Sequence, residues 1–363
     1  MFDMENVLAG RIFDKTDLTL TDVAEQQMNV REKMDELCDI LEQEIIQSDT
    51  DNVKKQEMLK KLRKFSNTKT NIMVVGATGC GKSSTINALF SCGHENVEIA
   101  KVGTNTDPET KDIEKYTIGN LTLWDTPGLG DGTVIDEHHI EVIRNLLREK
   151  DDDNNALIDL VLVILDGSSR DLGTSYRIIN DVIIPELGDE KDRILVALNQ
   201  ADIAIKTGRH WNYENNEPDE VLLKFLEEKT ESIRARIEGD SHIKVNPVYY
   251  CAGYTEENGD IVRPYNLSKL LYYIMSAIPM NKRVAVAEGM NVDSENFVYN
   301  DNTIDYEEKM QDMFGNDDWD DYIDEYVDKG MEFGKHILGV PGAVIGALFG
   351  GLIGCARDVI NDL

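Results

Sequence analysis

The sequence predicts an α/β fold, a doubly wound sheet with helices on both faces. Short β-rich runs alternate with helical runs between Asn71 and Pro279 of the 363-residue chain. Some β-rich runs are almost wholly apolar, for example residues 160–165, as a sheet covered on both faces requires. Hydrophobic residues make up 41% of the chain and charged residues 29%, which excludes a wholly disordered or collagen-like protein.

The elements of this sheet can be assigned in chain order. Runs rich in β-branched residues predict strands, and longer runs with apolar residues three and four positions apart predict helices. The expected strands are residues 72–75, 113–118, 121–124, 158–165, 194–198 and 245–250. The expected helices are residues 82–90, 136–150, 172–187, 218–237 and 266–278.

A helical arm is expected before the sheet. Apolar residues recur at three- and four-residue steps between about residues 21 and 65, and a polar break at residues 48–52 divides them into a helical hairpin. Fewer than four clean heptads are present, which favours packing against the next domain over a free coiled coil. The expected division is an arm at 1–66, a central domain at 67–283, an acidic linker at 284–330 and a glycine-rich apolar tail at 331–363.

The charge of the chain excludes one class of partner. The 37 Lys and Arg residues against 69 Asp and Glu give a net charge of −32, which disfavours nucleic acid binding. Residues 288–328 hold 15 acidic residues and one lysine, and thus 14 of the 32 excess negative charges. This composition predicts a largely disordered linker, whose aromatic residues could form a partner-binding segment.

The cysteines, histidines and amino terminus favour a cytoplasmic protein. The five cysteines show no paired spacing, as in a reducing compartment, and no metal-ligand spacing appears. The adjacent His138 and His139 would point about 100° apart on a helix, so we expect ordinary surface residues. The first residues include acidic side chains where a secretory signal would be basic.

The tail leaves two alternatives open. Residues 337–356 carry no charge, and about 20 apolar residues can cross a bilayer as a helix. Gly342, Gly346, Gly350 and Gly354 repeat every four residues, as in closely packed helix pairs. Pro341 and the glycines weaken a helix, however. Membrane contact or helix association therefore stands beside simple docking on the preceding domain.

One motif carries chemistry by itself. Residues 76–83 match G-x-x-x-x-G-K-[ST] between an apolar strand and a helix, where backbone N–H groups and the helix N-terminus bind phosphate. Lys82 is expected to bridge the β- and γ-phosphates and Ser83 to bind Mg²⁺. We expect Cys80 to be a tolerated small residue rather than a redox gate. The expected phosphate-binding residues are Gly76, Ala77, Thr78, Gly79, Cys80, Gly81, Lys82, Ser83 and Ser84.

Two later motifs complete a family pattern. Asp125-Thr126-Pro127-Gly128 reads as D-x-x-G, and Asn199-Gln200-Ala201-Asp202 resembles N-K-x-D. With the first motif, and in this order, residues 71–279 resemble a Ras-like P-loop GTPase of the translation-factor class, similar to Era and the septins. The resemblance is strongest to bacterial, often prophage-borne proteins described as 50S ribosome-binding GTPases.

This resemblance implies roles for particular residues. Asp125 would hold Mg²⁺ through water, the Gly128 amide would sense the γ-phosphate, and Thr110 would join the metal when that phosphate is present, with Thr104 and Thr106 as competing choices. Lys82, Thr110 and Gly128 would then serve hydrolysis. Asn199 and Asp202 would bind guanine, Gln200 replaces the usual lysine over the base, and Cys251-Ala252 would donate a backbone N–H to guanine O6.

Two departures concern hydrolysis. Leu129 stands where Ras has its water-orienting glutamine, and Gly79 stands where potassium-using relatives have asparagine. Arg170 or a group from a second subunit could supply the missing charge; the alternative, which the residue pattern favours, is that Arg170 is a plain surface residue of its loop.

The resemblance implies a GTP-hydrolysing switch that binds GTP, GDP and Mg²⁺. The alternatives are a slow septin-like assembly module that pairs as a homodimer across the nucleotide or contacts a membrane, a ribosome-associated GTPase, and an ATPase.

Overall fold

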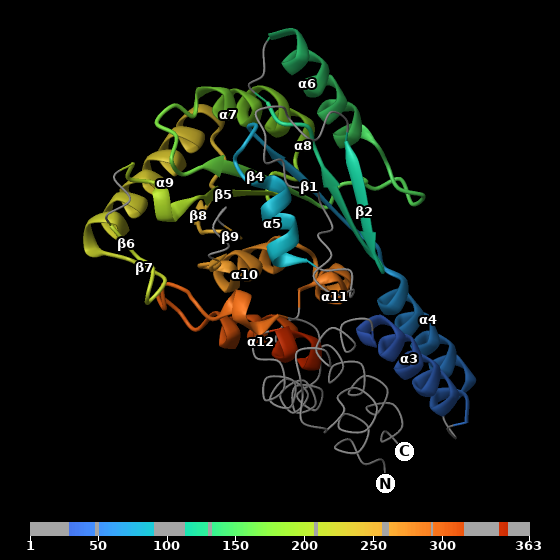
Figure 1. Cartoon of the computed structure of the whole chain (residues 1–363). Coiled ribbons are helices and arrows are strands. Elements are labelled where there is room, and N and C mark those ends of the chain that lie inside the picture. Colours follow the sequence, from blue (N-terminus) through green and yellow to red (C-terminus); the bar gives the residue numbers. More distant parts are fainter. Residues whose placement is uncertain are drawn as a thin grey trace.

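The computed structural model describes residues 29–47, 51–90, 113–129, 133–206, 210–255, 261–291, 293–315 and 341–347. Its centre is a six-stranded sheet in the order β2-β3-β1-β4-β5-β8 (Figure 1). The antiparallel strand is β2, which pairs with β3, and the other pairings are parallel. The strands are β1 (Thr70–Gly76), β2 (Glu114–Ile118), β3 (Leu121–Asp125), β4 (Leu160–Asp166), β5 (Ile194–Asn199) and β8 (Val248–Tyr249). Two small ribbons, β6–β7 (Trp211–Asn212, Glu217–Pro218) and β9–β10 (Tyr254–Thr255, Ile261–Val262), lie outside it.

The apolar strands separate two hydrophobic cores. Along β1, Ile72 and Val74 belong to one core, whereas Met73 and Val75 belong to the other. The same alternation runs along β4 and β5, because successive side chains point to opposite faces of a sheet. The expected doubly wound sheet is therefore confirmed, and its strands are hydrophobic at nearly every position because both faces are buried.

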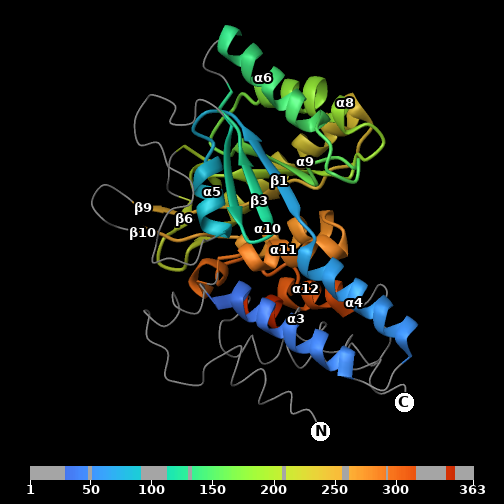
Figure 2. The ribbon, with the colours of Figure 1, turned by 90° about the vertical axis from the view of Figure 1, so that its right-hand side faces the viewer.

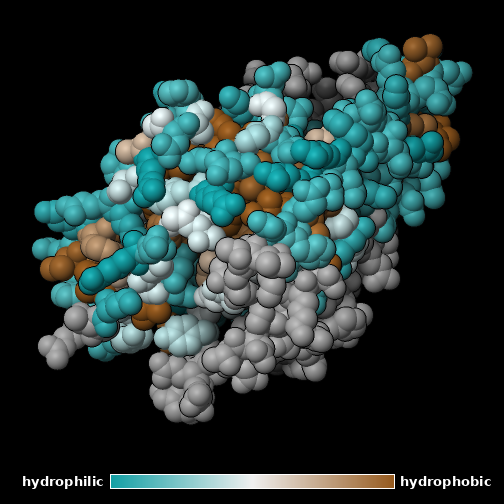
Figure 3. Space-filling view, turned by 90° about the horizontal axis from the view of Figure 1, so that it is seen from above, coloured by the Kyte–Doolittle hydropathy of each residue, from teal (hydrophilic) through white to brown (hydrophobic). Residues whose placement is uncertain are grey.

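Helices cover both faces (Figure 2). One core includes side chains of α6 (Thr133–Arg148), α7 (Gly173–Ile178), α8 (Ile184–Leu187) and α9 (Glu220–Ser241). A five-residue π-helical segment, Ile179–Ile183, joins α7 to α8. The opposite core includes α5 (Lys82–Leu89), α10 (Leu267–Ala277) and α11 (Met280–Gly289). Seen from above, the surface of the described residues is mostly hydrophilic, with hydrophobic groups scattered across it (Figure 3).

The arm forms the expected helical hairpin, α3 (Asn29–Gln47) and α4 (Asn52–Asn67). Arg63 Nε donates to Glu42 Oε1 across the two helices at 2.8 Å. The buried side chains of the hairpin, Leu41, Ile45 and Leu62 among them, belong to the same core as α10 and α11. The hairpin therefore packs against the sheet domain, as the sequence predicts, while residues 1–28 lie outside the described residues.

The acidic region corrects the prediction of a disordered linker. A short 3-10 helix (Ser294–Phe297) and α12 (Tyr306–Gly315) pack beside α10. Phe297, Tyr306 and Met310 are 1–3% exposed, so these spaced apolar residues bury enough surface to order the chain around them. The prediction is wrong for residues 288–291 and 293–315, and residues 316–328 lie outside the described part.

Only a short piece of the tail is described. Residues 341–347 are helical and buried throughout, and Ala343, Val344, Ile345 and Ala347 belong to the same core as the arm and α12. This piece packs on the chain itself, as the docking alternative expects. Across the described ranges, none of the helices has the length and apolar character needed to span a membrane.

We expect Leu41→Ala to lower the free energy of unfolding by about 2–4 kcal/mol, because a buried leucine of the arm would leave a cavity. Leu41 is 1% exposed, whereas Ile46 on the same helix is 55% exposed. Ile46→Ala is the matched control and should change stability by less than about 0.5 kcal/mol. Denaturant unfolding of both variants measures the difference, and equal stabilities would contradict the packing of the arm.

Candidate functional site

The glycine-rich loop (residues 76–83) connects β1 to α5 at the carboxyl edge of the sheet. Gly79 and Gly81 have φ of +75° and +91°, a region that side-chain-bearing residues rarely adopt. A Cβ at Gly81 would lie 2.2 Å from Asn199 Nδ2, so this position excludes any side chain. The chain therefore bends tightly here, and the N-terminal turn of α5 begins directly after the bend, facing the loop.

Lys82 folds back over this loop. Its Nζ donates to the carbonyl oxygens of Gly76 and Ala77, both at 3.3 Å, and its side chain is buried. A lysine ammonium has three donor hydrogens, so one remains for a further acceptor. The result is a fixed positive charge at the site, as phosphate binding requires.

Ser83 and Asp125 form the acidic side of the site. Ser83 Oγ donates to Asp125 Oδ2 at 2.9 Å, and Asp125 ends β3 beside β1. Asp125 is fully buried, and its Oδ1 has no hydrogen-bond partner among the described residues. Burial raises the pKa of this carboxyl, although Lys82 opposes the shift. A hydroxyl beside a carboxylate with an open oxygen fits Mg²⁺, which binds through few protein ligands and keeps waters and phosphate oxygens.

The D-x-x-G segment rests directly on the glycine-rich loop. The Thr78 amide donates to Leu129 O at 3.1 Å, and a Cβ at Gly128 would lie 2.3 Å from Thr78 Oγ1. Leu129 is 1% exposed and joins the core on the α6 face of the sheet. Its side chain therefore cannot orient a water in the site.

His139 corrects a sequence interpretation. We expected a surface residue, but His139 is buried, and its Nδ1 lies 3.1 Å from Gly128 O. His139 lies on α6, so this helix is coupled to the D-x-x-G segment. The sequence offered no signal for this contact, because the pairing depends on how α6 lies across the sheet.

Asn199 ties the other side of the site together. Its Nδ2 donates to Cys80 O at 3.0 Å, and its Oδ1 accepts from the Ala252 amide at 3.0 Å. Gln200 Nε2 also reaches the loop and donates to Gly79 O at 2.9 Å. The Ala252 amide is thus engaged by Asn199, and its contact with guanine O6 stays a prediction.

Asp202 is a buried acceptor. Cys251 Sγ donates to Asp202 Oδ1 at 3.1 Å, while Oδ2 has no hydrogen-bond partner among the described residues. Burial raises the pKa of Asp202, although the Cys251 hydrogen bond opposes the shift. One carboxylate oxygen is therefore left for a donor that this part of the chain does not supply.

The remaining predicted residues have different outcomes. Ser84 lies half-buried in the first turn of α5. Burial raises the pKa of the Cys80 thiol in spite of Lys82, which disfavours a reactive thiolate and favours the small-residue interpretation. Arg170 is exposed in the loop after β4. Thr110, with its competitors Thr104 and Thr106, lies outside the described residues.

Sequence reasoning missed two supports of the site. Lys229 of α9 donates to Ser169 O at 2.8 Å and also to Gly167 O, and so fixes the loop that carries Arg170. The hydroxyls of Thr85 and Tyr250 lie 2.6 Å apart and join α5 to the segment before Cys251. Both contacts link residues more than 50 positions apart, so no local pattern could have indicated them.

One part of the chain is similar in sequence to a known protein family. Residues 34–145 match the family described as interferon-inducible GTPase (IIGP). Interferon-gamma-inducible GTPase 10 of Mus musculus is 43% identical over 77 residues, which are 20% of this chain and 18% of that protein. Translocase of chloroplast 120 of Arabidopsis thaliana is 36% identical over 119 residues, 32% of this chain and 11% of that protein. The chain thus matches less than a fifth of the length of either relative.

Similarity to solved structures extends over more of the chain, as one example shows. Toc33 from Arabidopsis thaliana in complex with Mg²⁺ and GMPPNP aligns with a TM-score of 0.37 at 18% identity. The alignment covers 64% of this chain and 91% of that chain. The matched family segment, residues 34–145, contains the glycine-rich loop and Asp125.

Removal of the Asp202 charge should stabilise the nucleotide-free protein. Because burial raises the pKa of Asp202, ionisation of this carboxyl opposes folding, and the stability present at low pH is lost as the pH rises through the folded-state pKa. We expect Asp202→Asn to raise the free energy of unfolding by about 1 kcal/mol at pH 8. The gain should shrink as the pH falls below the folded-state pKa.

Denaturant unfolding at several pH values measures this gain. Asp189→Asn, at an exposed position, is the control and should leave stability unchanged. A loss of stability in Asp202→Asn at pH 8 would contradict the buried, half-satisfied carboxylate.

Proposed function

We propose that this chain binds GTP and GDP with Mg²⁺, hydrolyses GTP to GDP and phosphate, and acts as a nucleotide-dependent switch. The observation that carries the proposal is the position of the glycine-rich loop between two buried carboxylates. Ser83 connects the loop to Asp125 on one side, and Asn199 connects it to the segment of Asp202 on the other. One nucleotide could therefore contact a phosphate-binding loop and a base-reading acid together.

The phosphate side supports the triphosphate. Lys82 offers a donor and a positive charge, while Ser83 and Asp125 would hold Mg²⁺, with Thr110 as a further proposed ligand. Bound Mg²⁺ would neutralise charge on the phosphate oxygens. Gly128 lies against Thr78 of the glycine-rich loop, where its amide would donate to a γ-phosphate.

The base side favours guanine. Guanine presents two adjacent donors, N1–H and the 2-amino group, and Asp202 can accept both, since Oδ2 lacks a partner among the described residues. Adenine offers no such pair, and a buried carboxylate left unpaired costs several kcal/mol. This argument disfavours the ATPase alternative.

Hydrolysis requires a group that the D-x-x-G segment does not provide. Leu129 points into a core, so a water must be oriented by another residue. Arg170 is exposed in the loop that Lys229 holds, and a second subunit could supply the group instead. This gap favours a second candidate function, slow nucleotide-dependent assembly as a homodimer across the nucleotide. Membrane contact through the tail, ribosome association and a cytoplasmic location stay proposals.

Lys82→Ala should weaken GTP binding by about 100-fold, because a charge-assisted contact to phosphate contributes about 1.5–3 kcal/mol. Fluorescent GTP analogues titrated into the full chain with Mg²⁺ measure the affinity. Lys224→Ala is the control, since Lys224 is exposed and pairs only at 3.8 Å with Glu228 on the same helix. The proposal would be overturned if GTP affinity of the wild-type protein did not depend on Mg²⁺, or if the wild-type protein bound ATP more tightly than GTP.

Arg170→Ala should slow single-turnover GTP hydrolysis by about tenfold or more while nucleotide affinity stays unchanged, if Arg170 supplies the missing charge. Rapid mixing with excess enzyme measures the rate. A variant that hydrolyses at the wild-type rate, with a rate per molecule that rises with protein concentration, would assign the role to a second subunit.

A further inference from the structure

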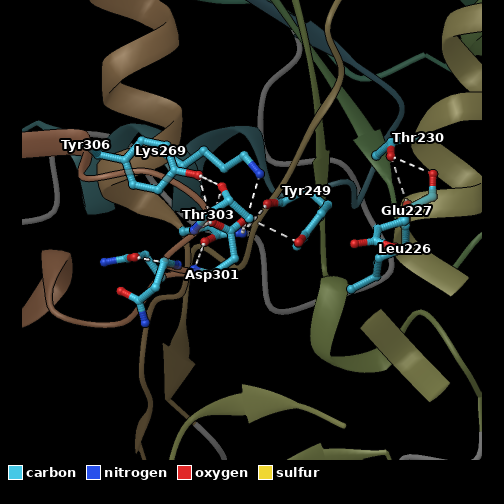
Figure 4. Close-up of polar contacts among 11 residues, drawn as sticks. Leu226, Glu227, Thr230, Tyr249, Lys269, Asp301, Thr303 and Tyr306 are labelled. Carbon is cyan, nitrogen blue, oxygen red and sulfur yellow. Dashed lines mark hydrogen bonds and ion pairs between the residues drawn. The ribbon is translucent and has the colours of Figure 1, made fainter. Parts of the chain in front are cut away.

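Asp301 is a buried acid that organises the segment after α11 (Figure 4). Its side chain is only 3% exposed and forms an ion pair with Lys269 of α10. Its Oδ1 accepts from Tyr306 Oη at 2.7 Å and from Thr303 Oγ1 at 2.9 Å, and its Oδ2 accepts from Tyr249 Oη at 3.1 Å. Burial alone would raise the pKa of Asp301, but the hydrogen bonds from Lys269 and Tyr306 outweigh it and lower the pKa.

One side-chain contact and one backbone contact of Asp301 lead to the loop that would bind guanine. Tyr249 ends β8, two residues before Cys251. Asn266 provides the second route, because the Asp301 amide donates to Asn266 Oδ1 at 2.8 Å and Asn266 Nδ2 donates to Tyr249 O at 3.1 Å. Both routes from Asp301 therefore reach Tyr249 at the end of β8.

The residue before Asn266 holds Cys251 itself. Tyr265 and Cys251 exchange two backbone hydrogen bonds, each of 3.0 Å. Cys251 in turn donates to Asp202, and the next amide, Ala252, donates to Asn199. Asp301 thus fixes the strand end and the paired backbone that set the positions of both proposed guanine contacts.

We propose that Asp301 is a positioning residue for guanine recognition, acting through Tyr249 and Asn266 on the loop at residues 251–252. The proposal rests on the proposed function, since it concerns the same site. Its consequence is that the acidic segment after the sheet domain belongs to the base-binding side of the site. Asp301 does not touch the nucleotide in this scheme; it holds the groups that do.

The test compares two nucleotides that differ at one group. Inosine diphosphate lacks the 2-amino group of guanine and keeps the same phosphates, so the ratio of GDP to inosine diphosphate affinity reports the alignment of Asp202. Calorimetry on the full chain should show about a tenfold loss of GDP affinity in Asp301→Ala, the scale of one charge-assisted hydrogen bond. The affinity ratio should fall about fivefold.

Two further variants make the result decisive. Tyr249→Phe removes only the hydroxyl that contacts Asp301, so it should also lower the ratio of GDP to inosine diphosphate affinity. This variant keeps the test possible if Asp301→Ala does not fold. Asp293→Ala is the matched control, because the Asp293 carboxylate accepts from the Glu295 amide within its own turn. It removes the same charge from the same segment and should retain both affinities.

The outcomes separate the two proposals. Wild-type protein that binds GDP, with variants whose affinity ratio equals that of wild type, would overturn the positioning role alone. A proportional loss of both affinities in Tyr249→Phe would also overturn it, because a merely structural role weakens both nucleotides equally. Wild-type protein that does not bind GDP would overturn the proposed function and this inference with it.

Discussion

The side-chain amide of Asn199 makes the two hydrogen bonds on which the rest of the site depends. It donates to Cys80 O and accepts from the Ala252 amide, so one planar group joins segments 119 and 53 positions away. A carboxylate would lack the donor and an aliphatic side chain would lack both groups. Strands β1, β4, β5 and β8 lie in this order in the sheet and are parallel. The carboxyl ends of β1, β5 and β8 therefore meet at one edge, where this bridge can form.

The same edge holds an electrostatic cost. Asp125 and Asp202 are both buried, each has one oxygen without a partner among the described residues, and burial raises the pKa of both. The packed cores on the two faces of the sheet offset that cost. A ligand that completes these carboxylates would stabilise the folded state by mass action, so affinity for such a ligand and stability would be linked through the same two side chains.

Much of this arrangement could be predicted from local patterns, because the hydrophobic period identifies the strands and the glycine-rich loop has a fixed context. Gly81 and Lys82 lie where their motif requires. The contacts of His139 and Lys229 could not be predicted, since each depends on where a helix crosses the sheet. The proposed metal ligand Thr110 belongs to residues outside the described ranges and stays a prediction.

The acidic segment shows why composition alone predicts a disordered linker where the structure has an ordered one. Net charge averages over many residues, whereas order depends on a few buried ones: Phe297, Tyr306 and Met310 supply apolar surface, and Asp301 is the acid buried with a lysine partner. Exposed acids elsewhere in the segment remain solvated and do not oppose that packing. Since Tyr249 of the central sheet donates to Asp301, a boundary at residue 283 would divide one hydrogen-bonded network. The unit that supports the loop at residues 251–252 therefore extends through α12.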